Sequence, residues 1–456
     1  MSETSKIYKP KPVSGFPEWL PEERIAEQRW LDHIRKTFES YGFCSIETPS
    51  VEEIDVLLAK GEVDKEIYVL ERLHKDEDSD KEARLALHFD QTVPLARYVA
   101  MHFNDLVFPF KRYQMQRVWR GERPQMGRMR EFTQCDIDVI HVDNLPLSFD
   151  AEIPAMIYDT LAGLNIGRVQ LRISNRKILR GYLLAIGLKD DGKITEVFRA
   201  IDKIDKISGT EFHLLVNKAL EGTTVSSFDV NSFQVVISEK YKTSAELEKS
   251  LKRFGYFDEA FKNDYFRQGL EELSFVLDNL SYLPEDAVVA DLSIVRGLDY
   301  YTGTVYETQL LDVPEFTGSV CSGGRYDDLA GSYINKHLPG VGISIGFSRL
   351  FDVIRQTRPD LLGIGPKGPA HILMVLPNEE QRAVAADAAR TLRTRGYNVE
   401  LYHAPQKIKK QMEYASKKGI PFVWFPPFDA GGTNEIKNMQ TGEQSEADPN
   451  TWEMGT

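Results

Sequence analysis

The sequence predicts an α/β protein. It has an α+β part on a mainly antiparallel sheet, a mostly helical insertion, and a small α/β domain toward the C-terminal end. Three observations support this prediction. Apolar runs on both sides of a loop at 122–129, which contains Pro124 and Gly127, indicate a β-hairpin. Charged amphipathic helices dominate residues 175–281. After a Pro/Gly-rich linker at 358–369, strands alternate with helices, which is typical of a largely parallel α/β domain.

Length and composition limit the classes of protein that fit. A chain of 456 residues suggests roughly two to four domains. The net charge of −13 argues against non-specific coating of nucleic acid but allows a local basic patch. The three cysteines form neither a CxxC pair nor a zinc-ligand spacing. Because no signal-type segment or apolar run of about 18 residues occurs, we expect a cytoplasmic protein without a membrane span.

The first part of the chain alternates helices and strands. Apolar residues at helical spacing predict a helix at 21–41 that ends at Gly42. The elements expected after it are strand 43–51, interrupted by Pro49, strand 85–88, helix 92–102, hairpin strands 110–120 and 130–140, helix 149–161 and strand 169–173.

The hairpin has the most distinctive chemistry in the sequence. Four arginines lie within eleven positions, at 120, 123, 128 and 130. Guanidinium groups match phosphate oxygens, so the cluster indicates a site for a polyphosphate. Gln134, Asp136 and Asp138 follow at alternate positions and should share one face of the strand. From composition alone, a solvated hairpin that protects a sheet edge explains the arginines equally well.

The rest of the chain divides into further predicted segments. Strand character returns at 287–294 and is followed by three Gly- and Tyr-rich motifs at 296–307, 322–329 and 340–350. In the last motif, the spacing of Gly342 and Gly346 predicts one face of a helix, with Arg349 near that face. A GxGxxG pattern at 363–368 is not a dinucleotide site, because it contains Pro366 and precedes a strand.

The C-terminal elements complete the predicted organisation. They are strand 371–376, helix 379–395, strand 398–402, basic helix 406–418 and strand 421–425, followed by a loosely ordered tail at 442–456. The predicted domains are a catalytic domain at 1–174 and 282–357, the helical insertion at 175–281, the linker at 358–369 and a last domain at 370–456.

Together these motifs resemble the histidyl-tRNA synthetase family of class II aminoacyl-tRNA synthetases, over nearly the whole chain. Residues 46–51 resemble the first class II motif, which lies at a dimer interface, and residues 120–138 resemble the second. Residues 340–350 resemble the third motif, with Arg349 as its arginine. The segments RGLDYYTGTVYE and SGGRYDDL are similar to two signatures that separate the histidine enzymes from the rest of the class.

The resemblance implies a histidine-binding set. Asp90 and Thr92 would hold the α-amino group, with Gln91 contributing backbone and Gln134 assisting. Asp138 would accept a hydrogen bond from the imidazole. The residues that complete the set are Arg296, at the carboxylate, and Tyr300, Tyr301 and Tyr326, around the ring.

It also implies roles in ATP and tRNA binding. Arg120 would bind the α-phosphate, and Arg296 would lie between that phosphate and the histidine carboxylate; these two are the implied catalytic residues. The remaining ATP-binding residues would be Glu122, Arg128, Phe132, which stacks on adenine, and Arg349. Arg123 and Gln125 would meet the acceptor end of the tRNA. Mg²⁺ is expected with ATP, and no protein metal ligand is assigned.

The implied activity is that of a histidine–tRNA ligase. It would convert L-histidine and ATP into histidyl-adenylate and pyrophosphate and then transfer histidine to the 3′ end of its tRNA, as a homodimer. The alternative is a catalytically silent paralogue that senses histidine or tRNA. Such proteins tend to lose the phosphate-binding arginines or the anticodon domain, whereas this chain keeps Arg120, Arg296 and Arg349.

The last domain resembles the class II anticodon-binding domain. Its basic helix would contact phosphates through Lys407, Lys409, Lys410, Lys417 and Lys418. The sequence departs from the family pattern at two places. His88 stands where the family often has arginine, and residues 425–435 are irregular where a strand-to-turn pattern is usual.

Overall fold

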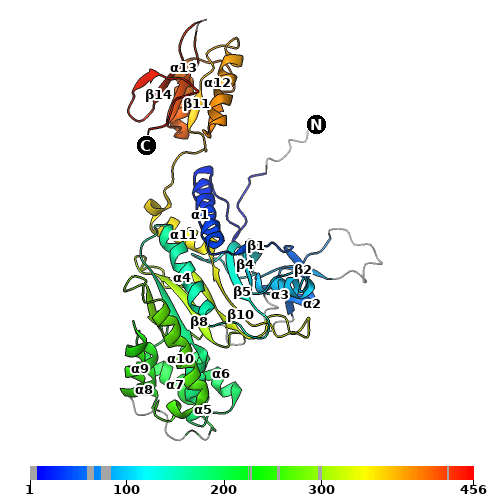
Figure 1. Cartoon of the computed structure of the whole chain (residues 1–456), viewed down its shortest axis with the longest axis vertical. Helices are drawn as coiled ribbons and strands as arrows, with labels where there is room; N and C mark the ends of the chain where they lie inside the picture. Colours follow the sequence, from blue (N-terminus) through cyan, green and yellow to red (C-terminus); the bar gives the residue numbers. More distant parts are fainter. Residues whose placement is uncertain are drawn as a thin grey trace, which may run out of the picture. The chain divides into compact units, whose positions relative to one another are not determined.

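The computed structural model describes residues 8–58, 66–72, 84–223, 225, 229–253, 257–295, 300–428 and 431–455. The chain divides into two compact units (Figure 1). One contains Leu31–Leu361 together with the chain before Glu18, and the other contains Glu18–Trp30 and Leu362–Thr456.

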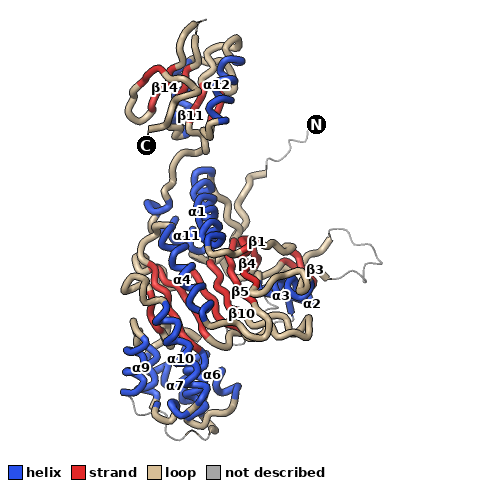
Figure 2. Tube along the Cα trace, viewed as in Figure 1, coloured by secondary structure: helices blue, strands red, loops and turns tan. Residues whose placement is uncertain are grey.

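An eight-stranded sheet forms the centre of the first unit (Figure 2). Its strands, in spatial order, are β1 (Cys44–Ser45), β4 (Phe110–Trp119), β5 (Glu131–Ile140), β10 (Gly340–Ile345), β9 (Cys321–Tyr326), β8 (Thr304–Leu310), β6 (Val169–Asn175) and β7 (Val288–Ala290). Only the outer pairs β1–β4 and β6–β7 are parallel. The predicted fold class is therefore confirmed, including the hairpin, whose strands β4 and β5 pair along their whole length.

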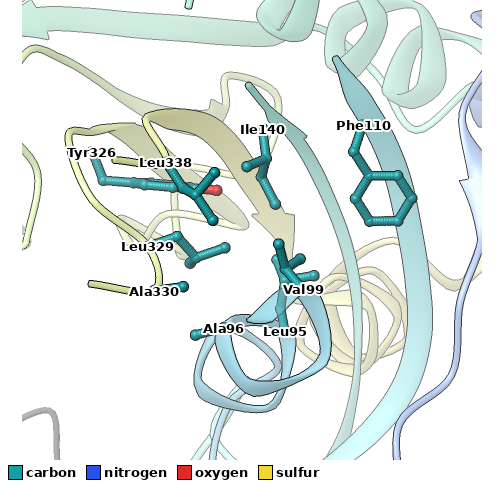
Figure 3. Close-up of a cluster of buried hydrophobic side chains, with 9 residues drawn as sticks. All are labelled: Leu95, Ala96, Val99, Phe110, Ile140, Tyr326, Leu329, Ala330 and Leu338. Carbon is teal, nitrogen blue, oxygen red and sulfur yellow. The ribbon is translucent and has the colours of Figure 1, made fainter. Parts of the chain in front are cut away.

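Helices pack on this sheet through apolar faces. They are α3 (Thr92–Met101), α4 (Ser148–Gly163), α11 (Phe347–Thr357) and the part of α1 (Pro21–Ser40) from Leu31 onward, where the Phe38 ring lies 5.8 Å from that of Tyr113. Figure 3 shows Leu95 and Val99 of α3 on the side of Ile140 of β5, in a buried cluster that also contains Phe110 of β4. This contact fixes the start of α3, where Asp90, Gln91 and Thr92 lie, beside the hairpin. A short helix and a two-stranded sheet lie before α3: β2 (Val51–Glu53), α2 (Ile54–Leu58) and β3 (Leu85–Leu87).

The segment between β6 and β7 is helical. Its elements are α5 (Arg176–Ala185), α6 (Asp191–Ile201), α7 (Gly209–Leu220), α8 (Val230–Ser238), α9 (Ser244–Arg253), the 3₁₀ turn η4 (Ala260–Lys262) and α10 (Asp264–Asn279). Helices α5 and α10 cross closely. Gly181 leaves room for this crossing, since a Cβ at that position would come within 2.5 Å of the Phe266 backbone nitrogen. These helices belong to the first compact unit, and their status as a separate domain stays a prediction.

The second unit has its own five-stranded sheet. Its elements are β11 (Ile372–Met374), α12 (Arg382–Thr394), β12 (Val399–Leu401), α13 (Ile408–Lys418), β13 (Phe422–Phe425), β14 (Glu435–Asn438) and β15 (Gln444–Glu446). The 3₁₀ turn η5 (Pro359–Leu362) precedes them, and only its last residue, Leu362, belongs to this unit. Strands β12, β11 and β13 are parallel, as predicted, while β14 and β15 extend the sheet antiparallel.

Two expectations were wrong. Residues 340–345 form strand β10 rather than a helix, because Val341, Ile343 and Ile345 alternate with small residues at a period of two. The described part of the tail is held in place: β15 pairs with β14, and the ring of Trp452 lies 5.1 Å from that of Tyr397. An aromatic residue near the chain end therefore adds to the core of the second unit.

Candidate active site

The polar residues of the hairpin lie on one face of the central sheet. In the strand ladder, Gln134 is paired with Gln116, Asp136 with Gln114, and Asp138 with Arg112. On its other side, β5 pairs with β10, which places Ser344 opposite Asp136 and Gly342 opposite Asp138. All of these β5 residues are buried. Such a continuous buried polar surface serves binding rather than packing, because burying polar groups costs free energy unless they find partners.

Asp138 is held by an arginine and a tyrosine. Its Oδ2 lies 2.5 Å from Nη2 of Arg112, a fully buried guanidinium, and its Oδ1 accepts a 3.0 Å hydrogen bond from the hydroxyl of Tyr326. Glycines in β10 make room for these side chains. A Cβ on Gly342 would lie 2.1 Å from Asp138 Oδ1, and one on Gly340 would lie 2.3 Å from the Tyr326 ring. The carboxylate therefore has a fixed orientation.

Three tyrosines form an aromatic wall near Asp138. The ring of Tyr300 lies 5.0 Å from that of Tyr326 and 5.1 Å from that of Tyr301. Burial, followed by the nearby charge of Asp138, raises the pKa of each of these hydroxyls, which stay protonated and able to donate. Gly324 of β9 accommodates Tyr301, whose ring would lie 2.8 Å from an added Cβ.

Asp136 has a strongly perturbed carboxyl. Burial raises its pKa to about 7, although Arg112 and a side-chain hydrogen bond from Ser344 both act to lower it. The charges of Asp138 and Asp90 raise it further. The carboxyl therefore titrates near neutral pH.

Asp90, Gln91 and Thr92 lie at the start of α3. Asp90 caps the helix by accepting a 3.1 Å hydrogen bond from the backbone nitrogen of Val93. The side-chain amide of Gln91 donates to the carbonyl oxygens of Gln116 and Gln134 and so ties the helix start to the hairpin. Thr92 and Tyr300 line a pocket beside the start of α3.

Another pocket adjoins the polar face and contains the residues that the family resemblance implies for ATP binding. It is lined by Arg120, Glu122, Arg128, Phe132 and Arg349, together with Gln134 and Ser344 from the polar face. The Arg120 guanidinium lies 5.1 Å from the centre of the Phe132 ring and donates through Nε to the carbonyl oxygen of Phe89 at 3.0 Å. Arg128 pairs with Glu122 at 3.2 Å. The pocket thus combines cations with an aromatic face.

Arg349 connects the pocket to the hairpin loop. Its Nε donates to the carbonyl oxygen of Gly127 at 2.7 Å, and its Nη1 donates to that of Ser319 at 3.0 Å. Arg123 and Gln125 lie on the same loop, are exposed, and are not among the pocket-lining residues. Arg296 lies outside the described residues.

Sequence reasoning missed several residues of this surface. Arg112 and Ser344 were not singled out, although each is paired in the ladder with a predicted site residue or its neighbour. A charged residue at an inward-facing strand position was the available signal for Arg112. The departure at His88 is a packing feature: burial lowers its pKa, and its Nε2 lies 2.7 Å from the Arg117 carbonyl oxygen.

Two negative findings apply to the described part of the chain. No group of three or more His, Cys, Asp or Glu side chains is arranged to hold a metal ion. Among the same residues, none of the helices has the length and apolar character needed to cross a membrane.

A mainly antiparallel sheet with an arginine-bearing hairpin beside an arginine-bearing helix defines the catalytic unit of a class II aminoacyl-tRNA synthetase. A family model described as "Histidyl-tRNA synthetase" matches residues 15–350, and one described as "Anticodon binding domain" matches residues 370–451. The chain belongs to the histidyl-tRNA synthetase family.

Individual relatives agree with the family models. The chain is 53% identical to a histidine–tRNA ligase of Thermobifida fusca, over 99% of this chain and 100% of the relative. It is 43% identical to one of Bifidobacterium longum, over 97% of each. Its structure matches the crystal structure of histidyl-tRNA synthetase from Nostoc sp. with a TM-score of 0.85 and 37% identity, over 97% of each chain.

The function follows from these findings. The chain is an ATP-dependent aminoacyl-tRNA ligase that joins histidine to tRNA, and the sensor alternative is the less supported one.

Proposed function

We propose that histidine binds on the polar face of the sheet and ATP binds in the adjoining arginine-lined pocket. The observation that carries this proposal is their continuity: Gln134 and Ser344 belong to the polar face and also line the pocket of Arg120 and Arg349. Two reactants bound side by side are held in position for reaction, which converts a bimolecular step into an effectively unimolecular one.

The histidine end uses the fixed carboxylate and the tyrosine wall. Asp138 accepts a hydrogen bond from an imidazole nitrogen, while Tyr300, Tyr301 and Tyr326 enclose the ring. Asp90, Thr92 and Gln134, with the backbone of Gln91, bind the α-amino group. An amino acid whose side chain lacks an imidazole N–H would leave Asp138 without its ligand partner. The site would therefore bind it much more weakly than histidine, which makes the site selective.

The ATP end positions the α-phosphate for attack. A carboxylate oxygen of histidine forms a bond to the α-phosphorus, the bond to the bridging oxygen breaks, and pyrophosphate leaves. No protein nucleophile is required. Arg120 and Arg296 stabilise the charge that develops on the phosphate, Phe132 stacks on adenine, and Glu122, Arg128 and Arg349 complete the ATP site.

Mg²⁺ accompanies ATP in this proposal. Proteins commonly hold Mg²⁺ with one or two carboxylates plus the phosphates of the substrate, and Glu122 is a pocket-lining carboxylate that could serve. When bound, the ion neutralises phosphate charge.

The remaining parts of the proposal concern tRNA and assembly. Arg123 and Gln125 on the exposed hairpin loop contact the acceptor end, and the second unit contacts the anticodon arm. The proposal keeps the domain boundaries expected from the sequence, with the insertion at 175–281. The enzyme acts in the cytoplasm as a homodimer, so light scattering should give twice the 52.0 kDa chain mass.

Arginine variants test the ATP end of the proposal. Arg120→Ala and Arg296→Ala should each lower histidine-dependent ATP–pyrophosphate exchange by about 100- to 1000-fold, because each removes a preorganised cation. Arg117→Ala is the matched control: Arg117 lies on β4, which ends just before Arg120, is largely exposed, and pairs with Glu131. Near-normal exchange by folded Arg120→Ala protein would show that the charge is supplied elsewhere.

A further inference from the structure

The N-terminal turn, at residues 13–16, is bonded to the end of the hairpin loop that joins β4 to β5. The backbone nitrogen of Phe16 donates to the carbonyl oxygen of Val13 at 3.0 Å, and Gly15 has a φ of +85°, which is the pattern of a type II turn. The carbonyl oxygen of Gly15 accepts from the backbone nitrogen of Arg130 at 2.8 Å and from that of the next residue at 3.1 Å. The turn is therefore tied to the point where the loop ends and β5 begins.

The side chain of Arg130 joins this turn to the beginning of the loop. Its Nε donates to the carbonyl oxygen of Glu122 at 3.1 Å, and its Nη1 donates to that of Ser14 at a longer 3.5 Å. The backbone of Arg130 also extends the hairpin ladder, because its carbonyl oxygen accepts from the Arg120 nitrogen at 2.8 Å. Arg130 therefore contacts both ends of the loop as well as the N-terminal turn.

A second segment holds the start of the loop. The backbone nitrogen of Gly121 donates to the carbonyl oxygen of Glu66 at 2.8 Å. The ring of Tyr68, two residues after Glu66, lies 6.4 Å from that of Phe16 in an edge-to-face arrangement. The N-terminal turn and this segment therefore pack on each other, and each holds one end of the loop.

Arg130 differs from Arg120 and Arg128 in its surroundings. Among the described residues, those that line the arginine-lined pocket include Arg120 and Arg128 but not Arg130. Glu122, whose carbonyl oxygen accepts from Arg130, pairs through its carboxylate with Arg128 at 3.2 Å, and both of these residues line the pocket. A guanidinium that donates to two backbone carbonyls fixes their separation, because its donors have a rigid planar geometry.

We propose that the N-terminal turn and Arg130 are positioning elements of the ATP site, which hold Glu122 and Arg128 in the pocket by closing the base of the hairpin loop. The inference rests on the proposed binding of ATP by those two residues. Neither the turn nor Arg130 needs to contact ATP. Contacts that tie the loop ends to neighbouring backbone restrict the conformations of the loop, which lowers the entropy lost when Glu122 and Arg128 become ordered around ATP.

Gly15→Ala tests the inference without changing a charge. Its positive φ is unfavourable for alanine, and the added Cβ would lie 2.8 Å from Cγ of Arg130 and 2.9 Å from Cγ of Pro124. In histidine-dependent ATP–pyrophosphate exchange by the full chain, KM for ATP should rise about tenfold, the size expected for loss of hydrogen bonds that involve a charged group. KM for histidine should stay unchanged, because the strand ladder that carries Gln134 and Asp138 stays paired. An unchanged KM for ATP in folded Gly15→Ala protein would overturn the inference.

Gly42→Ala is the matched control for the turn. Gly42 has a similar φ of +79°, so alanine there meets the same kind of backbone strain, but no described atom lies within 4 Å of the added Cβ. The control should leave both KM values unchanged. If Gly42→Ala raises KM for ATP as much as Gly15→Ala does, the effect comes from general destabilisation and the inference is wrong.

Arg130→Met removes both guanidinium contacts and should reproduce the effect of Gly15→Ala on KM for ATP. Arg130→Lys keeps the charge but loses the Nε–H that reaches Glu122, so it should resemble Arg130→Met. A normal KM for ATP in Arg130→Lys would contradict the inference, because it would point to direct attraction between this charge and a phosphate. Arg168→Met, which removes an exposed guanidinium bound to Asp312, is the control and should leave both KM values unchanged.

An Arg128→Ala background shows whether the turn acts through the loop. In this background, Gly15→Ala and Arg130→Met should have little further effect on KM for ATP, because the side chain that they position is gone. Additive effects would rule the inference out. If Arg128→Ala raises KM for ATP and neither Gly15→Ala nor Arg130→Met does, the positioning inference alone fails. If Arg128→Ala itself leaves KM for ATP unchanged, the proposed ATP role of Arg128 fails, and the inference fails with it.

Discussion

Burial in the fold disfavours the charged form of Asp136, although this carboxyl belongs to the polar face on which we propose that histidine binds. Its pKa rises from 3.8 to about 7 when the chain folds, because burial disfavours the charged form. Arg112 on β4 and Ser344 on β10 oppose that shift, while Asp138 and Asp90 add to it. A raised carboxyl pKa means that the folded state binds the proton more tightly than the unfolded chain. The associated stability is present below pH 3.8 and is lost as pH rises through about 7.

Asp136→Asn tests this balance in the absence of ligands. Between pH 5.5 and 8, the unaltered chain should lose about 2 kcal/mol of unfolding free energy relative to the variant, as an upper value. Denaturant unfolding of both proteins at the two pH values measures the difference. Parallel pH dependences would mean that Asp136 is already ionised in the folded protein.

At this scale the sequence predicted that Gln134 and Asp138 share a face of the sheet, but it did not predict the residues that support them. Gln134 and Asp138 were identified by their spacing and by family resemblance, and their places on one sheet face agree with the strand period. Arg112 and Ser344 were missed, because their importance comes from strand pairing. A register of Asp138 with Arg112 and of Asp136 with Ser344 depends on which strands are neighbours, and the local sequence does not specify that.

Strand β10 shows at the scale of an element why glycine is needed. Its glycines face the Asp138 carboxylate and the Tyr326 ring, and in this way the strand shapes the proposed histidine pocket without contributing long side chains. The sequence pattern was ambiguous here. Glycines four apart fit a helix face, and the alternation of Val341, Ile343 and Ile345 decided in favour of a strand only in the folded context.

Gly342→Ala tests this element. The added methyl group would displace Asp138, since its Cβ would lie 2.1 Å from Oδ1 and 2.6 Å from the Ile137 carbonyl oxygen. Overpacking of this kind typically costs about 1–3 kcal/mol, so we expect KM for histidine to rise about tenfold or more with little change in KM for ATP. Gly365→Ala, where nothing lies within 4 Å, is the control. Equal effects on both KM values would contradict the assignment.

Helix α13 is a second element whose role follows from its charges. Lys407, Lys409, Lys410 and Lys417 are exposed, whereas Lys418 pairs with Glu400 at 2.8 Å and is held within its unit. The prediction of a basic helix was correct in position, but the sequence could not separate the exposed lysines from the paired one. That distinction depends on β12, which carries Glu400.

Over the whole molecule, the net charge of −13 makes local basic surfaces important for tRNA binding. Lys409→Glu and Lys410→Glu should lower kcat/KM for tRNA in aminoacylation and reduce its salt dependence, because each removes a phosphate contact. Exchange without tRNA should stay unchanged. Arg390→Glu on α12, which is exposed and paired with Asp387, is the charge-matched control. Equal losses in all three variants would indicate a general electrostatic effect.

The organisation of the whole chain was largely predictable. Periodicity and turn residues located the hairpin, the helical segment and the alternating C-terminal elements, because each is determined by local pattern. The order of strands in the central sheet could not be derived in this way. It joins β5 to β10, whose paired residues are at least 200 positions apart (Ile140 and Gly340), and this pairing shapes the face on which we propose that histidine binds.

The central claim is that this one surface activates histidine with ATP. Histidine-dependent ATP–pyrophosphate exchange by the full chain measures that reaction directly. Our account predicts exchange that requires histidine, is not supported by other amino acids, and falls by about 100- to 1000-fold in Arg120→Ala. Folded protein that binds histidine but shows no exchange would contradict the account and favour a catalytically silent sensor.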